Sequence, residues 1–100
     1  MLSDNPADVT VRARRADMLV GLGRFDEAAA QYRMVIERSP GNAAAWNNRG
    51  VCLLRLGRAS EAITCLTRAL ELNPRLEDAA RNLEAIRRAT PQPGSPVRVP

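Results

Sequence analysis

Histidine and lysine are both missing from this sequence of 100 residues, and only two cysteines and three aromatic residues occur. Without histidine a zinc site loses its commonest nitrogen ligand, and neither Cys52 nor Cys65 belongs to a CxxC pair. No stretch approaches the roughly 18 consecutive apolar residues of a membrane-spanning helix. We therefore expect no metal and no membrane segment, and we expect both cysteines to be buried free thiols rather than a disulfide or a redox pair.

The groups on which catalysis depends are also scarce. The sequence has no histidine to act as a general base and no phosphate-binding loop. The adjacent carboxylates at 26–27 and 77–78 occur where helix N-termini favour anions. We expect no enzyme and no cofactor. The first residues lack a basic flank followed by an apolar segment, which predicts a cytoplasmic protein without a signal peptide.

All fifteen cations are arginine, and the net charge is +4. Segments 24–38 and 76–90 are each neutral, whereas segment 42–58 holds Arg49, Arg55 and Arg58 with no acid. The positive charge is therefore local, which disfavours a surface built for nucleic acid. Hydrophobic residues make up 45% of the chain and are mostly alanine and leucine, which predicts a single all-α domain.

The chain repeats itself with a period of 34 residues. Leu-Gly-Arg at 22–24 recurs at 56–58, and aligning 9–42 on 43–76 gives nine identical positions. Apolar residues at helical spacing predict two helices in each unit, with a further helix after the second unit. Glycine and proline mark the helix ends, and asparagine marks two helix starts (Gly23, Gly57, Pro40, Pro74, Asn42, and Asn5 before Pro6). The expected helices are at 6–21, 25–38, 42–55, 59–72 and 76–89.

This pattern divides the chain into five segments. Residues 1–8 form a lead-in, 9–42 and 43–76 are the two repeat units, and 77–90 is a helix that caps the apolar face of the second unit. Residues 91–100 are rich in proline and predict a flexible tail or linker.

The second unit resembles the tetratricopeptide repeat through Trp46, Gly50, Leu53, Ala62, Leu66, Ala69 and Pro74, and the first unit through Ala16, Leu19, Gly23, Ala28, Tyr32 and Pro40. The resemblance covers about 9–76 and implies an α-solenoid of antiparallel helix pairs. Arginine departs from the family pattern at Arg12, Arg15 and Arg49. A charge at the interior position of Arg49 is costly unless it is paired.

The resemblance implies a protein-protein interaction scaffold, which binds a peptide or partner protein along the concave face lined by the first helix of each unit. Residues that point away from the Trp46 side of their helix predict the lining of this groove. We single out Asp17 on the first helix, Asn47, Asn48, Val51, Leu54 and Arg55 on the third, and Arg81 and Arg88 on the last. Thr10, Ala13, Val20, Ala44, Asp78, Asn82 and Ala85 share these faces. The arginines favour a peptide with acidic groups.

Each of these residues also has a structural interpretation. Arg55 is equally a solvated cation at a helix end, Asn48 is common at its place in the family without any ligand, and Val51 and Leu54 are as readily explained by packing. Some family members clamp the terminal carboxylate of chaperones with basic side chains. Here Asp17 and Asp78 occupy two of those places and would repel a carboxylate, so this ligand is disfavoured.

Three other functions remain open from the sequence. The chain could be an auxiliary module of a larger enzyme, with 91–100 as a linker. Nucleic-acid binding is a second alternative, although the three aromatic residues lie on packing faces rather than among the cations. Self-association is a third, with modules stacking end to end through Arg12 and Arg15 or through the last helix.

Overall fold

The computed structural model describes residues 6–89, and these form five helices and no strand. The helices are α1 (Pro6–Gly21), α2 (Phe25–Arg38), α3 (Ala43–Arg55), α4 (Ala59–Leu72) and α5 (Glu77–Ala89). The all-α prediction is confirmed, and every helix begins and ends within one residue of its expected position. The cap expected at Asn5 and the segment 91–100 lie outside the described residues.

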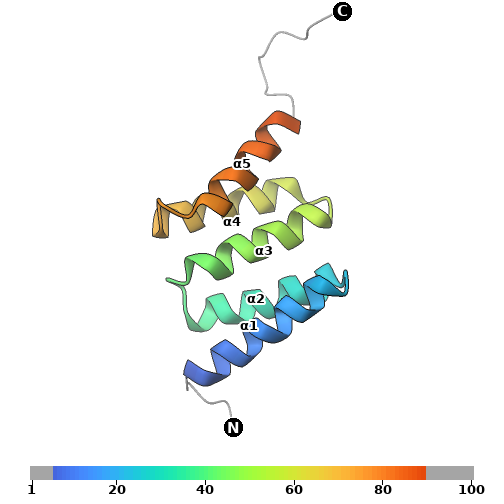
Figure 1. Cartoon of the computed structure of the whole chain (residues 1–100), viewed down its shortest axis with the longest axis vertical. Coiled ribbons are helices and arrows are strands. Elements are labelled where there is room, and N and C mark those ends of the chain that lie inside the picture. The colour runs from blue at the N-terminus through green and yellow to red at the C-terminus, as the bar shows by residue number, and fades with distance from the viewer. Residues whose placement is uncertain (1–5, 90–100) are drawn as a thin grey trace, which may run out of the picture.

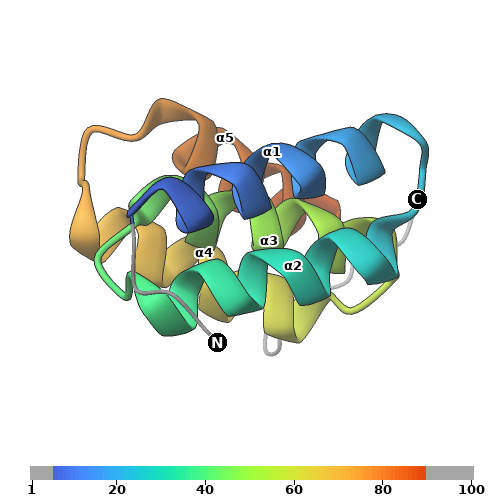
Figure 2. The same cartoon turned by 90° about the horizontal axis from the view of Figure 1, so that it is seen from below.

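The helices stack as antiparallel pairs in chain order (Figure 1). Seen from the end of the stack, α1, α3 and α5 form one layer, while α2 and α4 form the other (Figure 2). We call the two surfaces of the molecule the α1/α3/α5 face and the α2/α4 face. This arrangement is the α-solenoid that the 34-residue period predicts.

The turns within the two helix pairs have the same backbone geometry. Gly23 and Gly57 have φ angles of 76° and 77°, in the left-handed region that ends a helix and favours glycine. Asn42 begins α3, because its side-chain oxygen accepts a hydrogen bond of 3.1 Å from the backbone N–H of Ala45. Each of these roles matches the one expected from the sequence.

The core runs between the two layers. Leu53 and Leu66 are fully buried at the centre of one cluster, which continues into α5 through Leu83 and Ile86. α3 approaches α4 closely at Gly50, where an added Cβ would lie 2.9 Å from the Cγ of Leu66. Through these residues α5, the helix after the second pair, packs on α4.

Two further sequence expectations concern the cysteines and membrane insertion. Cys52 and Cys65 are both buried free thiols, as expected. Burial raises the pKa of Cys52 to about 11. Among the helices of residues 6–89, none combines the length and the apolar character needed to cross a membrane.

Candidate functional site

A line of polar side chains crosses the α1/α3/α5 face. The side-chain amide of Asn82 on α5 donates a hydrogen bond of 3.1 Å to the side-chain oxygen of Asn47 on α3. Asn47 in turn donates to the side-chain oxygen of Asn48 at 3.3 Å. At the other end of the line, the hydroxyl of Tyr32 on α2 donates a hydrogen bond to Asp17 on α1. A hydrogen bond between the side chains of Asn48 and Tyr32 joins the two parts, so four helices contribute to one polar track along this face.

A hollow of about 200 Å³ lies at the α1 end of this track, lined by Asp17, Val20, Tyr32, Asn48 and Val51. Asp17 is exposed, whereas Tyr32 is only 2% exposed and reaches the hollow from α2 with its hydroxyl group. Burial raises the pKa of Tyr32 far above its ordinary value, and its hydrogen bond to Asp17 and the charge of that carboxylate add to the rise. The hollow therefore presents an anionic acceptor between two valines.

The structure brings only some of the predicted groove residues together. Asp17, Asn48 and Val51 line the hollow with Val20, which the sequence also placed on this face. Asn47 lies on the same face but is 6% exposed, with both ends of its amide used by neighbouring asparagines. It therefore serves the track as a buried link between α3 and α5.

Leu54 and Arg55, on the last turn of α3, have opposite environments. Leu54 is partly buried and packs against the cluster around Leu53 and Leu66. Arg55 is exposed, and no ion pair joins it to any of the described residues. Of these two, only Arg55 offers a free polar group to a ligand.

The two predicted arginines of α5 line a second, open depression with Glu84, Ala85 and Ala89. Arg81 forms an ion pair of 2.7 Å with Asp78, and Arg88 one of 3.3 Å with Glu84. These pairs are exposed, so the solvent screens them strongly and each is worth less than about 1 kcal/mol. A ligand carboxylate can therefore compete for either guanidinium group at modest cost.

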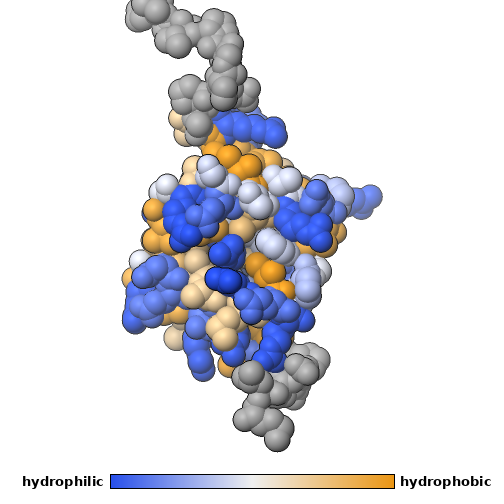
Figure 3. All heavy atoms as spheres, turned by 180° about the vertical axis from the view of Figure 1, so that it is seen from behind, coloured by the Kyte–Doolittle hydropathy of each residue, from blue (hydrophilic) through white to orange (hydrophobic). Residues whose placement is uncertain are grey.

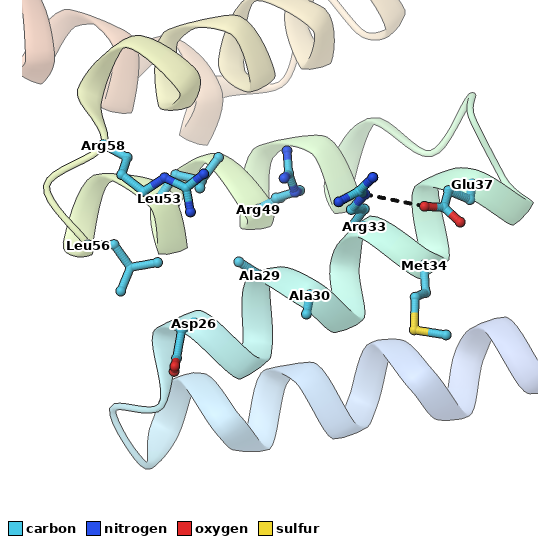
Figure 4. Close-up of a pocket in the computed structure, with 10 residues that line it drawn as sticks. All are labelled: Asp26, Ala29, Ala30, Arg33, Met34, Glu37, Arg49, Leu53, Leu56 and Arg58. Atoms are coloured by element: carbon cyan, nitrogen blue, oxygen red, sulfur yellow. Dashed lines mark ion pairs between the residues drawn. The ribbon is translucent and has the colours of Figure 1, made fainter.

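The opposite surface carries a cleft of about 410 Å³ between α2 and the α3–α4 pair (Figure 4). Small and apolar side chains alternate there with charged ones. Its lining residues are Asp26, Ala29, Ala30, Arg33, Met34, Glu37, Arg49, Leu53, Leu56 and Arg58. Charged side chains cover much of the surrounding α2/α4 face, with apolar ones between them (Figure 3). The sequence predicted no site on this face.

Arg49 forms part of this cleft and explains how an arginine is tolerated at an interior position. One of its terminal nitrogens lies 3.4 Å from the sulfur of Cys65 on α4, while its Nε is buried without a hydrogen-bond partner. The remaining side chain is half-buried beside Leu53. The aliphatic stem thus replaces an apolar residue, and the charged end reaches toward the open cleft.

The chemistry available on these surfaces is that of recognition. Within residues 6–89, no group of three or more Cys, Asp or Glu side chains is placed to hold a metal ion. The α1/α3/α5 face instead offers amides, the exposed carboxylate of Asp17, two valines and, on α5, arginines paired with exposed acids. Such a surface can hydrogen-bond a peptide backbone and hold its side chains.

Tyr32 is the residue of this face that sequence reasoning missed. Its spacing with Ala28 and Val35 assigns it to the core stripe of α2, and its ring is indeed buried there. The sequence did contain a signal for this role. Tyr32 carries the single hydroxyl group of an otherwise apolar stripe, and a buried hydroxyl group needs a hydrogen-bond partner. That partner, Asp17, lies fifteen residues earlier.

Comparison with known structures and families supports this picture. A family model described as Tetratricopeptide repeat matches residues 13–77. The first TPR of Spaghetti (RPAP3) bound to the HSP90 peptide SRMEEVD has a TM-score of 0.79 and 25% identity, covering 85% of this chain and 68% of that chain. YrrB, a TPR protein with an unusual peptide-binding site, has a TM-score of 0.75 and 29% identity, covering 80% of this chain and 41% of that one.

Similar curated proteins are much longer than the matched region. Sperm-associated antigen 1 of Mus musculus is 38% identical over 80 residues, covering 72% of this chain and 8% of the relative. Hsc70-interacting protein 1 of Drosophila melanogaster is 45% identical over 53 residues, covering 53% of this chain and 14% of the relative. The matches thus concern one module within each of these proteins.

Proposed function

Because this chain belongs to the tetratricopeptide repeat family, we propose that it is a non-catalytic scaffold that binds a peptide or partner protein in a groove on its α1/α3/α5 face. The observation that carries the proposal is the hollow beside the exposed Asp17, at the end of a continuous polar track. Residues 9–42 and 43–76 would be the two repeats, with 77–90 as the cap.

The charges along this face suggest how a bound segment would lie. Asp17 accepts hydrogen bonds at the α1 end, so it suits a lysine, an arginine or a backbone N–H of the ligand. Arg55, Arg81 and Arg88 suit acidic side chains at the other positions. The groove would therefore select a segment with a donor or cation near one end and carboxylates toward α5.

The relative that binds the HSP90 peptide SRMEEVD supports peptide binding by this fold. It does not support the same ligand here. Asp17 faces the hollow, and Asp78 pairs with Arg81 near the other end of the face. Both carboxylates oppose a second carboxylate at these positions, so an acidic C-terminus is a poor ligand for this chain.

Peptide selection on the full chain tests the proposal. We would select binders from a phage-displayed library on the immobilised protein, and measure each by fluorescence anisotropy against Asp17→Asn and Val51→Arg. Both variants should weaken binding by about tenfold or more, since each removes or fills part of the hollow. Asp26→Asn is the matched control, because it makes the same change in the cleft of the α2/α4 face.

Selected peptides that bind Asp17→Asn, Val51→Arg and the parent chain equally would refute the groove.

Two alternatives to the scaffold are distinguished by other results. Nucleic-acid binding predicts a steep loss of affinity with salt, but the burial of Tyr32 and the packing of Phe25 and Trp46 disfavour stacking on bases. A role as an auxiliary module predicts that adjoining coding sequence encodes a catalytic domain.

We also propose a cytoplasmic location. Cys52 and Cys65 are free and buried, which suits a reducing compartment. Fractionation of cells that express the tagged chain tests this.

A further inference from the structure

The side of α1 that faces away from α2 carries large apolar residues in the solvent. Val11, Met18 and Leu22 are 53%, 69% and 67% exposed. Spacings of seven and four residues place them on one side of the helix, and Arg14 and Arg15 lie between the first two on that side. We call these five residues the outer stripe of α1.

The 34-residue repeat shows what the corresponding stripe does in α3. Val11 corresponds to Ala45 and Met18 to Cys52, which are 4% and 0% exposed. Ala45 packs with Val35 of α2, and Cys52 packs with further residues of that helix. In α3, therefore, the stripe is the surface on which the preceding helix packs.

The same rule holds for α5. Its residues Ala79 and Ile86, one further period along, are 0% and 3% exposed and pack in the cluster that contains Leu66 and Ala69 of α4. Figure 2 looks onto the end of the stack formed by α1 and α2. Within residues 6–89, α1 is the only helix of its layer without a preceding helix on its stripe.

We propose that the outer stripe of α1 docks an amphipathic helix of a partner protein, one that carries small residues on its apolar side and acidic residues on its flanks. This goes beyond peptide binding in the groove, because it uses another surface of the molecule. The docked helix takes the place, relative to α1, that α2 takes relative to α3.

The large side chains of the outer stripe require small side chains on the partner helix. Val11 and Met18 are bulkier than Ala45 and Cys52 at the corresponding positions of α3. A helix can approach α1 as closely as α2 approaches α3 only if the side chains opposite are smaller than those of α2. Alanine and glycine opposite Met18 meet this requirement.

The charge of the stripe specifies the acidic flanks. Arg14 and Arg15 are exposed and form no ion pair with any residue the structure describes. An acid, Asp8, lies one turn before Val11, outside the stripe. A second copy of this chain is a poorer occupant. A two-fold contact between two such stripes would bring both arginine pairs together, and each chain carries a net charge of +4.

A matched pair of helical peptides tests the proposal. The probe is a fluorescent peptide with the sequence of residues 59–72, in which I63A and L66A supply small residues on the apolar side, R68E adds an acid, and a lactam bridge on the polar side holds it helical. The comparison peptide has the same two alanines and carries E61R and E71R in place of R68E. On the full chain at low salt, the acidic peptide should bind about tenfold more tightly than the basic one, and this ratio should shrink as salt screens the arginines.

Two changes in the chain locate the site. Met18→Glu and Arg15→Glu should each weaken binding of the acidic peptide by about tenfold. Ile63→Glu, at an exposed apolar residue of α4, and Arg75→Glu, in the loop before α5, are the matched controls and should have little effect. Asp17→Asn should also leave this binding unchanged, which separates it from the groove.

Three results would overturn the proposal. Equal binding of the acidic and basic peptides would show that Arg14 and Arg15 do not select a helix with acidic flanks. Binding that survives Met18→Glu would place the peptide elsewhere. Sedimentation that shows the unliganded chain to be a dimer, converted to a monomer by Met18→Glu, would identify a second copy as the occupant instead.

Discussion

The helix pairs α1/α2 and α3/α4 share the geometry of their turns, but their cores are filled differently. In the second pair, Gly50 admits the fully buried Leu66, and the surrounding cluster is apolar. In the first pair, Ala16 and Tyr32 occupy the corresponding positions, and the tyrosine extends to Asp17 on the groove face. One pair is thus closed by close packing, whereas the other connects its core to a candidate binding surface.

Leu66→Ala should give the largest effect on this comparison. The change opens a cavity beside Gly50 and should lower the free energy of unfolding by about 3 kcal/mol. Ile63→Ala on the same helix is the control and should cost about 1 kcal/mol or less, because Ile63 is 38% exposed. Urea denaturation measures both, and equal losses would mean that the second pair is not closed around Leu66.

Gly50→Ala should follow in size. Alanine favours a helix over glycine by about 1 kcal/mol, but its Cβ would overlap Leu66, and overpacking costs about 1–3 kcal/mol. We expect a net loss of up to about 2 kcal/mol. In the Leu66→Ala background the same change should become stabilising, because the overlap is gone. Ala16→Gly, in contrast, should only destabilise the first pair, since its Cβ already fits.

Tyr32→Phe should remove the polar link from the first pair. Loss of the hydrogen bond to Asp17 should cost about 1 kcal/mol at neutral pH. Because the pKa of Tyr32 is raised by folding, its contribution is complete below the unfolded value of about 10 and falls as pH rises above it. The variant should therefore lose less stability than the parent chain between neutral and strongly alkaline pH.

Cys52 adds to the same alkaline loss and must be separated from it. Its folded pKa of about 11 lies above the ordinary thiol value, so its contribution declines from about pH 9 upward. Urea unfolding of Tyr32→Phe, Cys52→Ala and the double variant at several pH values gives each share. If Tyr32→Phe lost as much stability at alkaline pH as the parent chain, that loss could not be assigned to the tyrosine.

Asn42→Ala tests whether the first helix of the second pair begins differently from the second helix of either pair. The side chain of Asn42 caps α3, whereas Arg24 and Arg58 precede α2 and α4 without a side-chain cap. Loss of the cap should cost about 1 kcal/mol, by thermal or urea unfolding. Asn73→Ala is the control, because the side chain of Asn73 also accepts a backbone hydrogen bond, from Arg75 at 3.1 Å, but after the end of α4 rather than at a helix start. A loss no larger than that of the control would argue against the cap.

Arg58→Gln should give the smallest effect. Arg58 forms a two-bond pair with Glu61, which holds the pKa of that carboxyl below its ordinary value. The pair therefore stabilises the fold above the ordinary carboxyl pKa and is lost as pH falls through the folded value. An NMR titration should show the Glu61 pKa rising in Arg58→Gln and unchanged in Arg75→Gln. No rise would show that the pair does not form in solution.

The helices and their ends could be predicted because their causes are local. Glycine at 23 and 57, asparagine at 42 and apolar residues at helical spacing act within one or two turns of the chain. The candidate site was predicted only in part. Asp17, Asn48 and Val51 meet as expected from their helix faces, but nothing local indicated that Asn47 would be buried against Asn82, 35 residues later.

The cleft on the α2/α4 face and the environment of Arg49 also could not be predicted from the sequence. The sequence identified Arg49 as a costly interior charge, but not the sulfur of Cys65 beside it or the open space ahead of it. Those features depend on how far one helix lies from the next. That distance follows from the side chains at every contact along the stack.

The sequence by itself determined that five helices form, that they pair with a 34-residue period, and which residues turn the chain between them. Only the tertiary structure decided which polar groups meet and which apolar stripe is covered. The physical reason is that helix formation is a property of neighbours along the chain. The Tyr32–Asp17 bond and the exposure of Met18 depend instead on which helix packs against which.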